Sequence, residues 1–167
     1  GHAVMSDALD QALIVTVAPN GAYKQPADHA ALPVTAAALA DTARACLDAG
    51  AAMLHLHIRD AEGRHSLDVE GYREALRVVR GAVGDAMVLQ VTSEAAGRYR
   101  APAQIAMVRA LRPEAVSIGL REVDTPDIGE AGLQDLFEWL VREQVMTQVI
   151  LYDAADVARW NALRAQG

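Results

Sequence analysis

The sequence has little cysteine, little positive charge and few aromatic side chains. Its single cysteine, Cys46, excludes an intramolecular disulfide and a cysteine metal cluster, and it favours a reducing, cytoplasmic setting. The formal net charge of -7 is the opposite of a nucleic-acid-binding footprint, and the 15 lysine and arginine residues are scattered. An aromatic content of 4% provides no platform for stacking bases. We therefore expect no nucleic-acid partner.

Long hydrophobic runs are also missing. No apolar stretch approaches the roughly 20 residues needed to span a bilayer, and the N-terminus lacks a basic segment followed by a hydrophobic one, so we expect no membrane partner. Gly1 and His2 resemble the remnant of a cleaved tag, and residues 1–10 are interpreted as this remnant and a tail. With 52% hydrophobic residues in the chain, residues 11–167 can form the core of a single domain.

Apolar runs alternate with segments of helical periodicity along the chain. The candidate strands are residues 12–18, 52–58, 87–91, 115–120 and 145–151. The candidate helices are 35–48, a segment that begins after Ser66 or Asp68 and runs to Arg80, 102–111, 131–144 and 153–164. This alternation predicts an α/β fold of parallel strands joined by crossover helices. Two architectures fit: a doubly wound open sheet, complete at this length, and a (β/α)8 barrel, which typically needs about 250 residues.

Two histidines one residue apart close the second candidate strand. In an extended strand, His55 and His57 share one face with Arg59, because side chains alternate. Two imidazoles at a strand end can supply two ligands of a transition-metal site. The alternative is that each histidine only hydrogen-bonds a neighbouring carbonyl. A metal site would need at least one further ligand, for which Glu94 is a candidate within this chain.

Other polar residues collect where the candidate strands end, and both candidate folds place their active sites at these carboxyl ends. These residues are Asn20, Arg59, Thr92, Ser93, Glu94, Ser117, Arg121 and Glu122. The segment Ala-Pro-Asn-Gly at 18–21 is no glycine-rich phosphate loop, which disfavours dinucleotide and P-loop chemistry. His29 and His65 fall in loops, where we expect both to be exposed to solvent.

Several segments together resemble the β-keto acid cleavage enzymes, which include the 3-keto-5-aminohexanoate cleavage enzyme. The segments are Val-Ala-Pro-Asn-Gly-Ala at 17–22, Leu-Pro-Val-Thr at 32–35, Ala-Gly-Ala at 49–51 leading into His-Leu-His-Ile-Arg-Asp at 55–60, and Gln-Val-Thr at 90–92. The resemblance implies a (β/α)8 barrel of which residues 11–167 supply about the first five βα units. The chain is then either a fragment or a relative that completes its barrel by association. We favour a fragment, because a five-stranded arc leaves two unpaired edges.

The resemblance also implies roles for individual residues. His55 and His57 would be ligands of Zn2+ or another divalent transition metal ion, and a glutamate from a late strand would be the third ligand. The catalytic arginine and aspartate of the family also come from late strands, expected beyond Gly167. Arg59 and Asp60 would orient the ligands or pin a loop, and the alternative for them is an ordinary salt bridge.

The candidate substrate-binding residues are Asn20, Tyr23, Thr92, Ser93, Ser117 and Arg121. For the serine and threonine hydroxyls, the alternative role is helix capping. Tyr23 lies near the position where the aminohexanoate-cleaving member carries a glutamate that holds the substrate amine. A phenol cannot supply that charge, so an amino-substituted substrate is disfavoured.

The activity implied is condensation of a β-keto acid with acetyl-CoA, followed by retro-Claisen cleavage to acetoacetate and a shortened acyl-CoA. The metal would act as a Lewis acid. Family members are commonly homo-oligomers, and we expect a tetramer. Rival interpretations are a zinc-dependent hydrolase or class II-type aldolase on the same barrel, and a non-catalytic partial barrel that serves as an interaction module.

Overall fold

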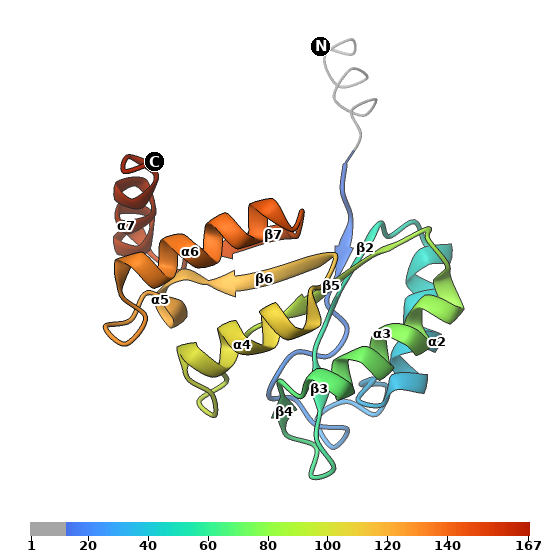
Figure 1. The fold of residues 1–167 in the computed structure, drawn as a ribbon. Helices are drawn as coiled ribbons and strands as arrows, with labels where there is room; N and C mark the ends of the chain where they lie inside the picture. The colour runs from blue at the N-terminus through green and yellow to red at the C-terminus, as the bar shows by residue number, and fades with distance from the viewer. Residues whose placement is uncertain (1–12) are drawn as a thin grey trace, which may run out of the picture.

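The computed structural model describes residues 13–167 (Figure 1). The expected tail, residues 1–10, lies outside that range. Within it, one parallel sheet has the strand order β1-β2-β5-β6-β7, so neighbours in the sheet follow one another along the chain. These strands are β1 (Thr16–Val17), β2 (Met53–Leu56), β5 (Val88–Thr92), β6 (Ala115–Gly119) and β7 (Met146–Ile150). A doubly wound sheet reverses its strand order part-way, and this sheet does not, as in a barrel.

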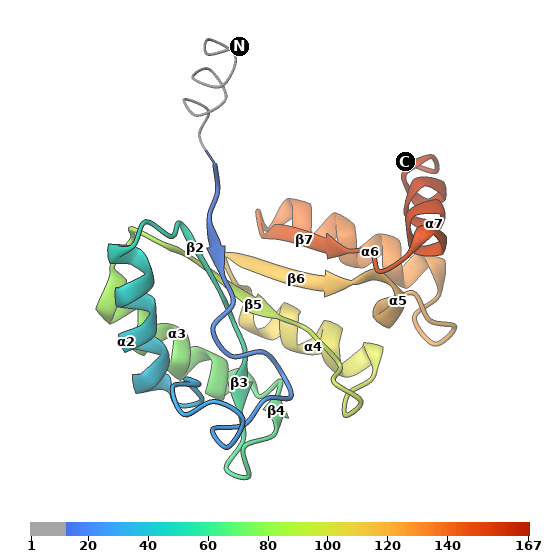
Figure 2. The same cartoon turned by 180° about the vertical axis from the view of Figure 1, so that it is seen from behind.

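The helices follow the strands in turn and cover the sheet (Figure 2). Right-handed crossovers that always advance in one direction place successive helices on the same face. They are α2 (Ala36–Asp48), α3 (Val69–Val83), α4 (Ala101–Leu111), α6 (Gly129–Arg142) and α7 (Ala154–Arg164). The side chains of Thr35, Asp68 and Asp153 each accept a backbone N–H three residues further on, and these caps explain why α2, α3 and α7 begin where predicted.

Four short elements differ from the predictions. The strand predicted over 52–58 leaves the parallel sheet after Leu56, because β3 (Ile58–Arg59) pairs antiparallel with β4 (His65–Ser66). The loop predicted after the fourth strand begins with a single helical turn, α5 (Leu120–Val123). The described part of the first predicted strand, 12–18, contributes only β1 to the sheet.

The core lies between the sheet and its helices. Leu54, Leu56 and Leu89 of the strands and Leu136 of α6 are at most 1% exposed, and burial of each such side chain contributes about 2 kcal/mol. The strands at the two sides of the sheet are less covered than β6, which is buried along its length. Exposed apolar side chains lie at these sides: Leu13, Ile14, Val15, Met146, Tyr152 and Val157. Among the described helices, none is long and apolar enough to cross a membrane.

Candidate active site

The histidine pair lies at the carboxyl end of β2, the second strand of the sheet. The ring centroids of His55 and His57 are 5.1 Å apart, so the two imidazoles come together as the sequence predicts. His57 is 4% exposed. Burial, followed by the neighbouring His55, His65 and Arg59, lowers the pKa of His57 to about 3. His57 is therefore neutral at pH 7, which is the protonation state that binds a metal ion.

Both histidines use the δ nitrogen for contacts within the protein. The Nδ1 atom of His55 lies 2.6 Å from the Gln90 side-chain oxygen. The Nδ1 atom of His57 lies 3.5 Å from the Nδ1 atom of His65 and 3.6 Å from a carboxylate oxygen of Glu94. Within the described chain, neither Nε2 atom has a hydrogen-bond partner. Two rings that contact the protein through Nδ1 and leave Nε2 free fit the histidine share of a divalent metal site.

The third ligand is not supplied by Glu94. Within residues 13–167, no group of three or more histidine, cysteine, aspartate or glutamate side chains is arranged to hold a metal ion. The Glu94 carboxylate faces the δ side of His57 instead. Burial and then repulsion from Glu122 raise the pKa of Glu94. The interpretation of Glu94 as a ligand therefore gains no support.

His65 was predicted to be solvent-exposed, and this is wrong. Its side chain is buried, at 2% exposure, because the β3–β4 pairing turns it towards His57 and the Tyr99 ring. Its Nε2 atom lies 2.8 Å from the backbone carbonyl oxygen of Glu94. The sequence signal that could have found it is Gly63, a turn residue placed between two short extended segments. His29 is exposed, as predicted.

Arg59 and Asp60 hold backbone segments around the histidines. The Arg59 guanidinium donates to the carbonyl oxygens of Gly21, Lys24 and Gly63 at 2.8 to 2.9 Å. The Asp60 carboxylate accepts the backbone N–H groups of Glu62 and Arg64 in its own turn. The bond from Arg64 is the first cause that lowers the pKa of Asp60. The pair thus joins the loop after β1 to the β3–β4 turn.

Asn20 contacts the backbone of a predicted metal ligand. Its side-chain nitrogen donates to the His57 carbonyl oxygen at 2.7 Å, and its side-chain oxygen accepts the His57 N–H at 3.1 Å. Asn20 is buried at 4% exposure. Both ends of this amide therefore fix the position of His57.

A small cavity of about 50 Å3 opens beside His55. Its lining is His55, Thr92, Glu94, Ser117, Gly119, Glu122, Ile150 and Tyr152. The Ser117 hydroxyl is buried here and has no hydrogen-bond partner within the described residues. The Thr92 hydroxyl accepts the Glu94 backbone N–H at 3.1 Å. The structure thus brings Thr92 and Ser117 together with His55.

The other predicted substrate-binding residues lie outside this lining. The Ser93 hydroxyl donates to the Ser117 carbonyl oxygen at 2.9 Å. Tyr23 is 68% exposed. The Arg121 guanidinium pairs with Asp153 and Asp156 at the start of α7.

Tyr152 was missed by the sequence reasoning, although it follows the fifth predicted strand at the same edge. Its ring lies near Gly119, where a Cβ atom would come within 3.3 Å of it. Burial and then the charges of Glu122 and Glu94 raise its pKa, so the phenol keeps its proton at neutral pH. The cavity lining therefore contains a phenol and two carboxylates besides His55.

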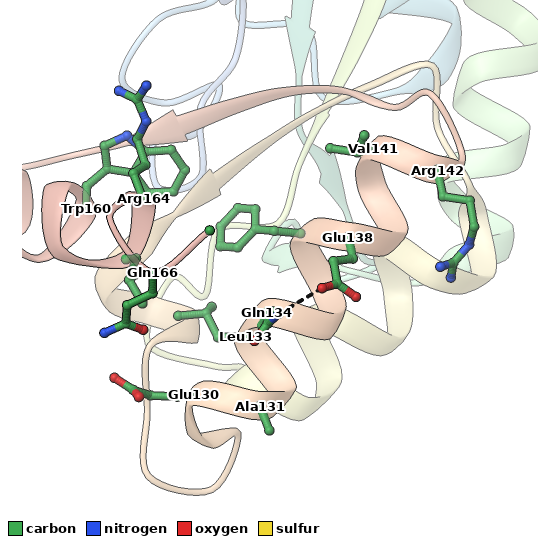
Figure 3. A pocket seen from close by; sticks show the side chains of 13 residues that line it. Glu130, Ala131, Leu133, Gln134, Glu138, Val141, Arg142, Trp160, Arg164 and Gln166 are labelled. Carbon is green, nitrogen blue, oxygen red and sulfur yellow. Dashed lines mark hydrogen bonds between the residues drawn. The ribbon is translucent and has the colours of Figure 1, made fainter.

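A larger cavity of about 600 Å3 lies elsewhere, between α6 and α7 (Figure 3). Leu133, Phe137, Val141, Trp160 and Leu163 form its apolar lining, and the Phe137 and Trp160 rings pack at 5.5 Å. It contains none of the predicted site residues. The predicted site residues therefore lie at the strand ends and not in this larger cavity.

Comparison with known proteins decides the family. Residues 12–167 match the family model described as beta-keto acid cleavage enzyme. The chain belongs to this family. This confirms the resemblance inferred from the sequence motifs.

Curated relatives of this β-keto acid cleavage enzyme family member are about twice as long. The 3-oxoadipate:acetyl-CoA acetyltransferase of Cupriavidus necator is 27% identical over 163 residues, 95% of this chain and 56% of that protein. The 3-keto-5-aminohexanoate cleavage enzyme of Fusobacterium nucleatum is 32% identical over 51% of this chain and 31% of that protein. The 3,5-dioxohexanoate:acetyl-CoA acetone transferase of Paraburkholderia graminis is 31% identical over 65% of this chain and 34% of that protein. The chain spans about half the length of the first of these relatives and a smaller part of the others.

The fold is also found in a solved structure. The apo structure of ObcA matches with a TM-score of 0.63 and 20% identity, over 81% of this chain and 33% of that chain. Together with the sequential order of the parallel strands, this likeness confirms the predicted fold class. The described residues form about five βα units of a (β/α)8 barrel.

Proposed function

We propose that this chain carries part of the active site of a metal-dependent enzyme that cleaves a β-keto acid with acetyl-CoA. The observation that carries the proposal is the histidine pair at the end of β2, with both Nε2 atoms free of protein partners. Two of the relatives are named for acetyl-CoA as a reactant, which supports it as co-substrate here. The products would be acetoacetate and a shortened acyl-CoA.

His55 and His57 would hold Zn2+ or a similar divalent ion. When bound, such an ion supplies Lewis-acid stabilisation of negative charge on a substrate oxygen. The Ser117 hydroxyl, buried and unpartnered within the described residues, is placed beside His55 to donate to a keto or carboxylate oxygen. Satisfying such a buried donor is worth about 1 to 3 kcal/mol, and the gain arises only when substrate is bound.

Glu94, Glu122 and Tyr152 line the cavity together with His55 and Ser117. The raised pKa of Glu94 and that of Tyr152 reflect the burial of acidic groups around one small space. A substrate carboxylate would be repelled by Glu94 and Glu122, so it would orient towards the metal ion and the Ser117 hydroxyl. We propose that the third metal ligand and the catalytic arginine and aspartate come from the part of the barrel that the longer relatives possess.

The remaining proposals concern context. We propose that residues 11–167 are the N-terminal part of a single (β/α)8 barrel domain, that the protein is a homo-oligomer, a tetramer, and that it acts in the cytoplasm. The single cysteine supports a reducing compartment. The exposed Tyr23 provides no carboxylate for a substrate amine, so the preferred β-keto acid lacks an amino group.

The decisive experiment measures acetoacetate release and bound zinc in the intact protein. We expect release only when acetyl-CoA and a β-keto acid are both present, with 3-oxoadipate preferred over 3-keto-5-aminohexanoate. His55→Ala and His57→Ala should each weaken zinc binding by more than about 100-fold and abolish release, because each removes a ligand. His29→Ala, an exposed histidine, is the matched control and should change neither.

Other outcomes would select a rival. Consumption of the keto acid without acetyl-CoA would favour a zinc-dependent hydrolase or aldolase at the same histidines. Absence of zinc and of turnover in the intact protein would favour a non-catalytic interaction module. Zinc binding unchanged in His57→Ala would overturn the proposed metal site.

A further inference from the structure

Two buried side chains that the sequence reasoning did not single out, Gln90 and His65, contact ring nitrogens of the predicted metal ligands. Each is 2% exposed, so water does not compete for these contacts. Each also has a second partner that constrains which of its atoms donates and which accepts. The ring nitrogen that carries the hydrogen can therefore be assigned along each of these two chains of contacts.

The first chain begins at a backbone carbonyl. The Glu94 carbonyl oxygen can only accept, so the Nε2 atom of His65, 2.8 Å away, carries a hydrogen. A buried imidazole that donates from Nε2 can accept at Nδ1 through its lone pair. That lone pair faces the Nδ1 atom of His57 at 3.5 Å. The proton between them therefore belongs to Nδ1 of His57, which leaves its Nε2 with a lone pair.

The second chain of contacts begins at the side-chain amide of Gln148. The Gln90 side-chain nitrogen donates to the Gln148 side-chain oxygen at 3.1 Å, which orients the Gln90 oxygen towards His55. This oxygen lies 2.6 Å from the Nδ1 atom of His55 and can only accept. The Nδ1 atom of His55 therefore donates, and its Nε2 also has a lone pair. Strands β5 and β7 supply this chain, whereas β4 and the loop after β5 supply the other.

We propose that His65 and Gln90 are positioning residues that hold His57 and His55 in the tautomer with the proton on Nδ1. The consequence is that both rings present an Nε2 lone pair to a divalent metal ion before it arrives. Without such partners a ring can place its proton on either nitrogen, and binding must then move it. The inference rests on the proposed function only for the identity of the bound group, since the tautomers belong to the metal-free protein.

The direct test is nitrogen-15 NMR of the histidine rings in the intact, metal-free protein at neutral pH. We expect His55 and His57 both to show a protonated Nδ1 and an unprotonated Nε2, and His65 the reverse. Signals are assigned by their loss in single histidine variants, with exposed His29, whose Nδ1 accepts the Ala31 N–H at 3.2 Å, as a reference outside the site. A proton on Nε2 of His55 or of His57 would overturn the inference.

Paired variants then test whether His65 and Gln90 are the cause. His65→Leu and Gln90→Met remove the acceptors, and each should restore a mixture of tautomers at its own histidine and weaken zinc binding about 10- to 100-fold. His65→Asn and Gln90→Glu keep an acceptor oxygen, and each should restore the single tautomer and most of the affinity. Unchanged tautomers in folded His65→Leu and Gln90→Met would contradict the proposal.

The outcomes separate this inference from the proposed function. If the tautomers are as expected but the intact protein binds no zinc, the metal-dependent function fails and the positioning role stands. If zinc binds and the wild-type rings carry their protons on Nε2, the function stands and the positioning role fails. Thermal unfolding of each variant shows whether lost affinity is merely lost structure.

Discussion

The histidine end of the sheet and its β7 end hold polar side chains in opposite ways. Around β2, side chains such as Asn20, Tyr72 and Gln90 are buried and hydrogen-bonded to backbone or to each other. Beyond β7, Arg121 pairs with Asp153 where both side chains are about half exposed. A buried contact is shielded from water and leaves a large penalty when broken, whereas an exposed pair is screened. The positions of the side chains at the histidine end are therefore fixed before any ligand binds.

The largest expected effect is on acid stability of the metal-free protein. The pKa of His57 is lowered from 6.5 to about 3, so the unfolded chain binds more protons between these values. The contribution of His57 to stability is therefore constant above pH 6.5 and decreases as the pH falls towards 3. The loss is at most roughly 5 kcal/mol. Urea unfolding across this pH range measures it.

The matched variants for acid stability are His57→Asn and His29→Gln. We expect His57→Asn to remove most of the decrease in stability with falling pH. The remainder should come from His65, because burial also lowers its pKa. His29→Gln should keep the wild-type slope, because His29 is exposed. An undiminished slope in His57→Asn would show that the titrating group lies elsewhere.

Next in size is the packing beneath the histidines. Leu56 of β2 is 0% exposed, and Leu56→Ala should lower the free energy of unfolding by about 3 kcal/mol, through lost burial and a residual cavity. Val141 of α6 is 79% exposed, so Val141→Ala should cost less than about 0.5 kcal/mol. Equal costs in urea unfolding would break the comparison between the two regions.

A smaller effect is expected at Tyr72. Its hydroxyl is fully buried and donates to the Thr92 carbonyl oxygen at 2.8 Å, at the strand end that lines the cavity. Tyr72→Phe should cost about 1 to 2 kcal/mol, because a buried carbonyl loses its donor. Tyr23→Phe, at an exposed phenol, is the control and should leave the urea midpoint unchanged. An unchanged free energy of unfolding in Tyr72→Phe would mean that another donor replaces the hydroxyl.

The smallest effect is expected at the β7 end. Arg121→Met removes the pairs with the exposed Asp153 and the buried Asp156. The Arg121 side chain is 47% exposed, so water reaches both pairs. The urea midpoint should fall by less than in Tyr72→Phe, and the difference from wild type should shrink further at high salt, which screens exposed charges. A salt-independent loss larger than that of Tyr72→Phe would contradict the contrast.

The long elements could be predicted from the sequence because each has both a period and a boundary signal. Continuous apolar runs mark β5, β6 and β7, and Thr35, Asp68 and Asp153 mark the helix starts. The meeting of His55 and His57 followed from their common place at a strand end. These features depend on neighbours in sequence or on alternation along one strand.

The missed features depend on contacts between distant segments. β3 and β4 have two residues each, too few to show any period, so their pairing and the burial of His65 were not predicted. In the sequence, Gln90 is only a polar residue within an apolar run. The pairing of β2 with β5 places it opposite His55. Within residues 13–167, no third side chain joins the two histidines in a group arranged to hold a metal ion, so the late-strand glutamate stays a prediction.

Arg59 has a consequence for how this site can change over time. Its guanidinium grips the loop after β1 through the carbonyl oxygens of Gly21 and Lys24, which every amino acid provides. Loop side chains that are exposed, such as Tyr23, can therefore vary while the loop stays in place. Because Arg59 contacts only backbone atoms there, a substitution at such a position changes the surface beside the histidines at little cost to the stability of the site.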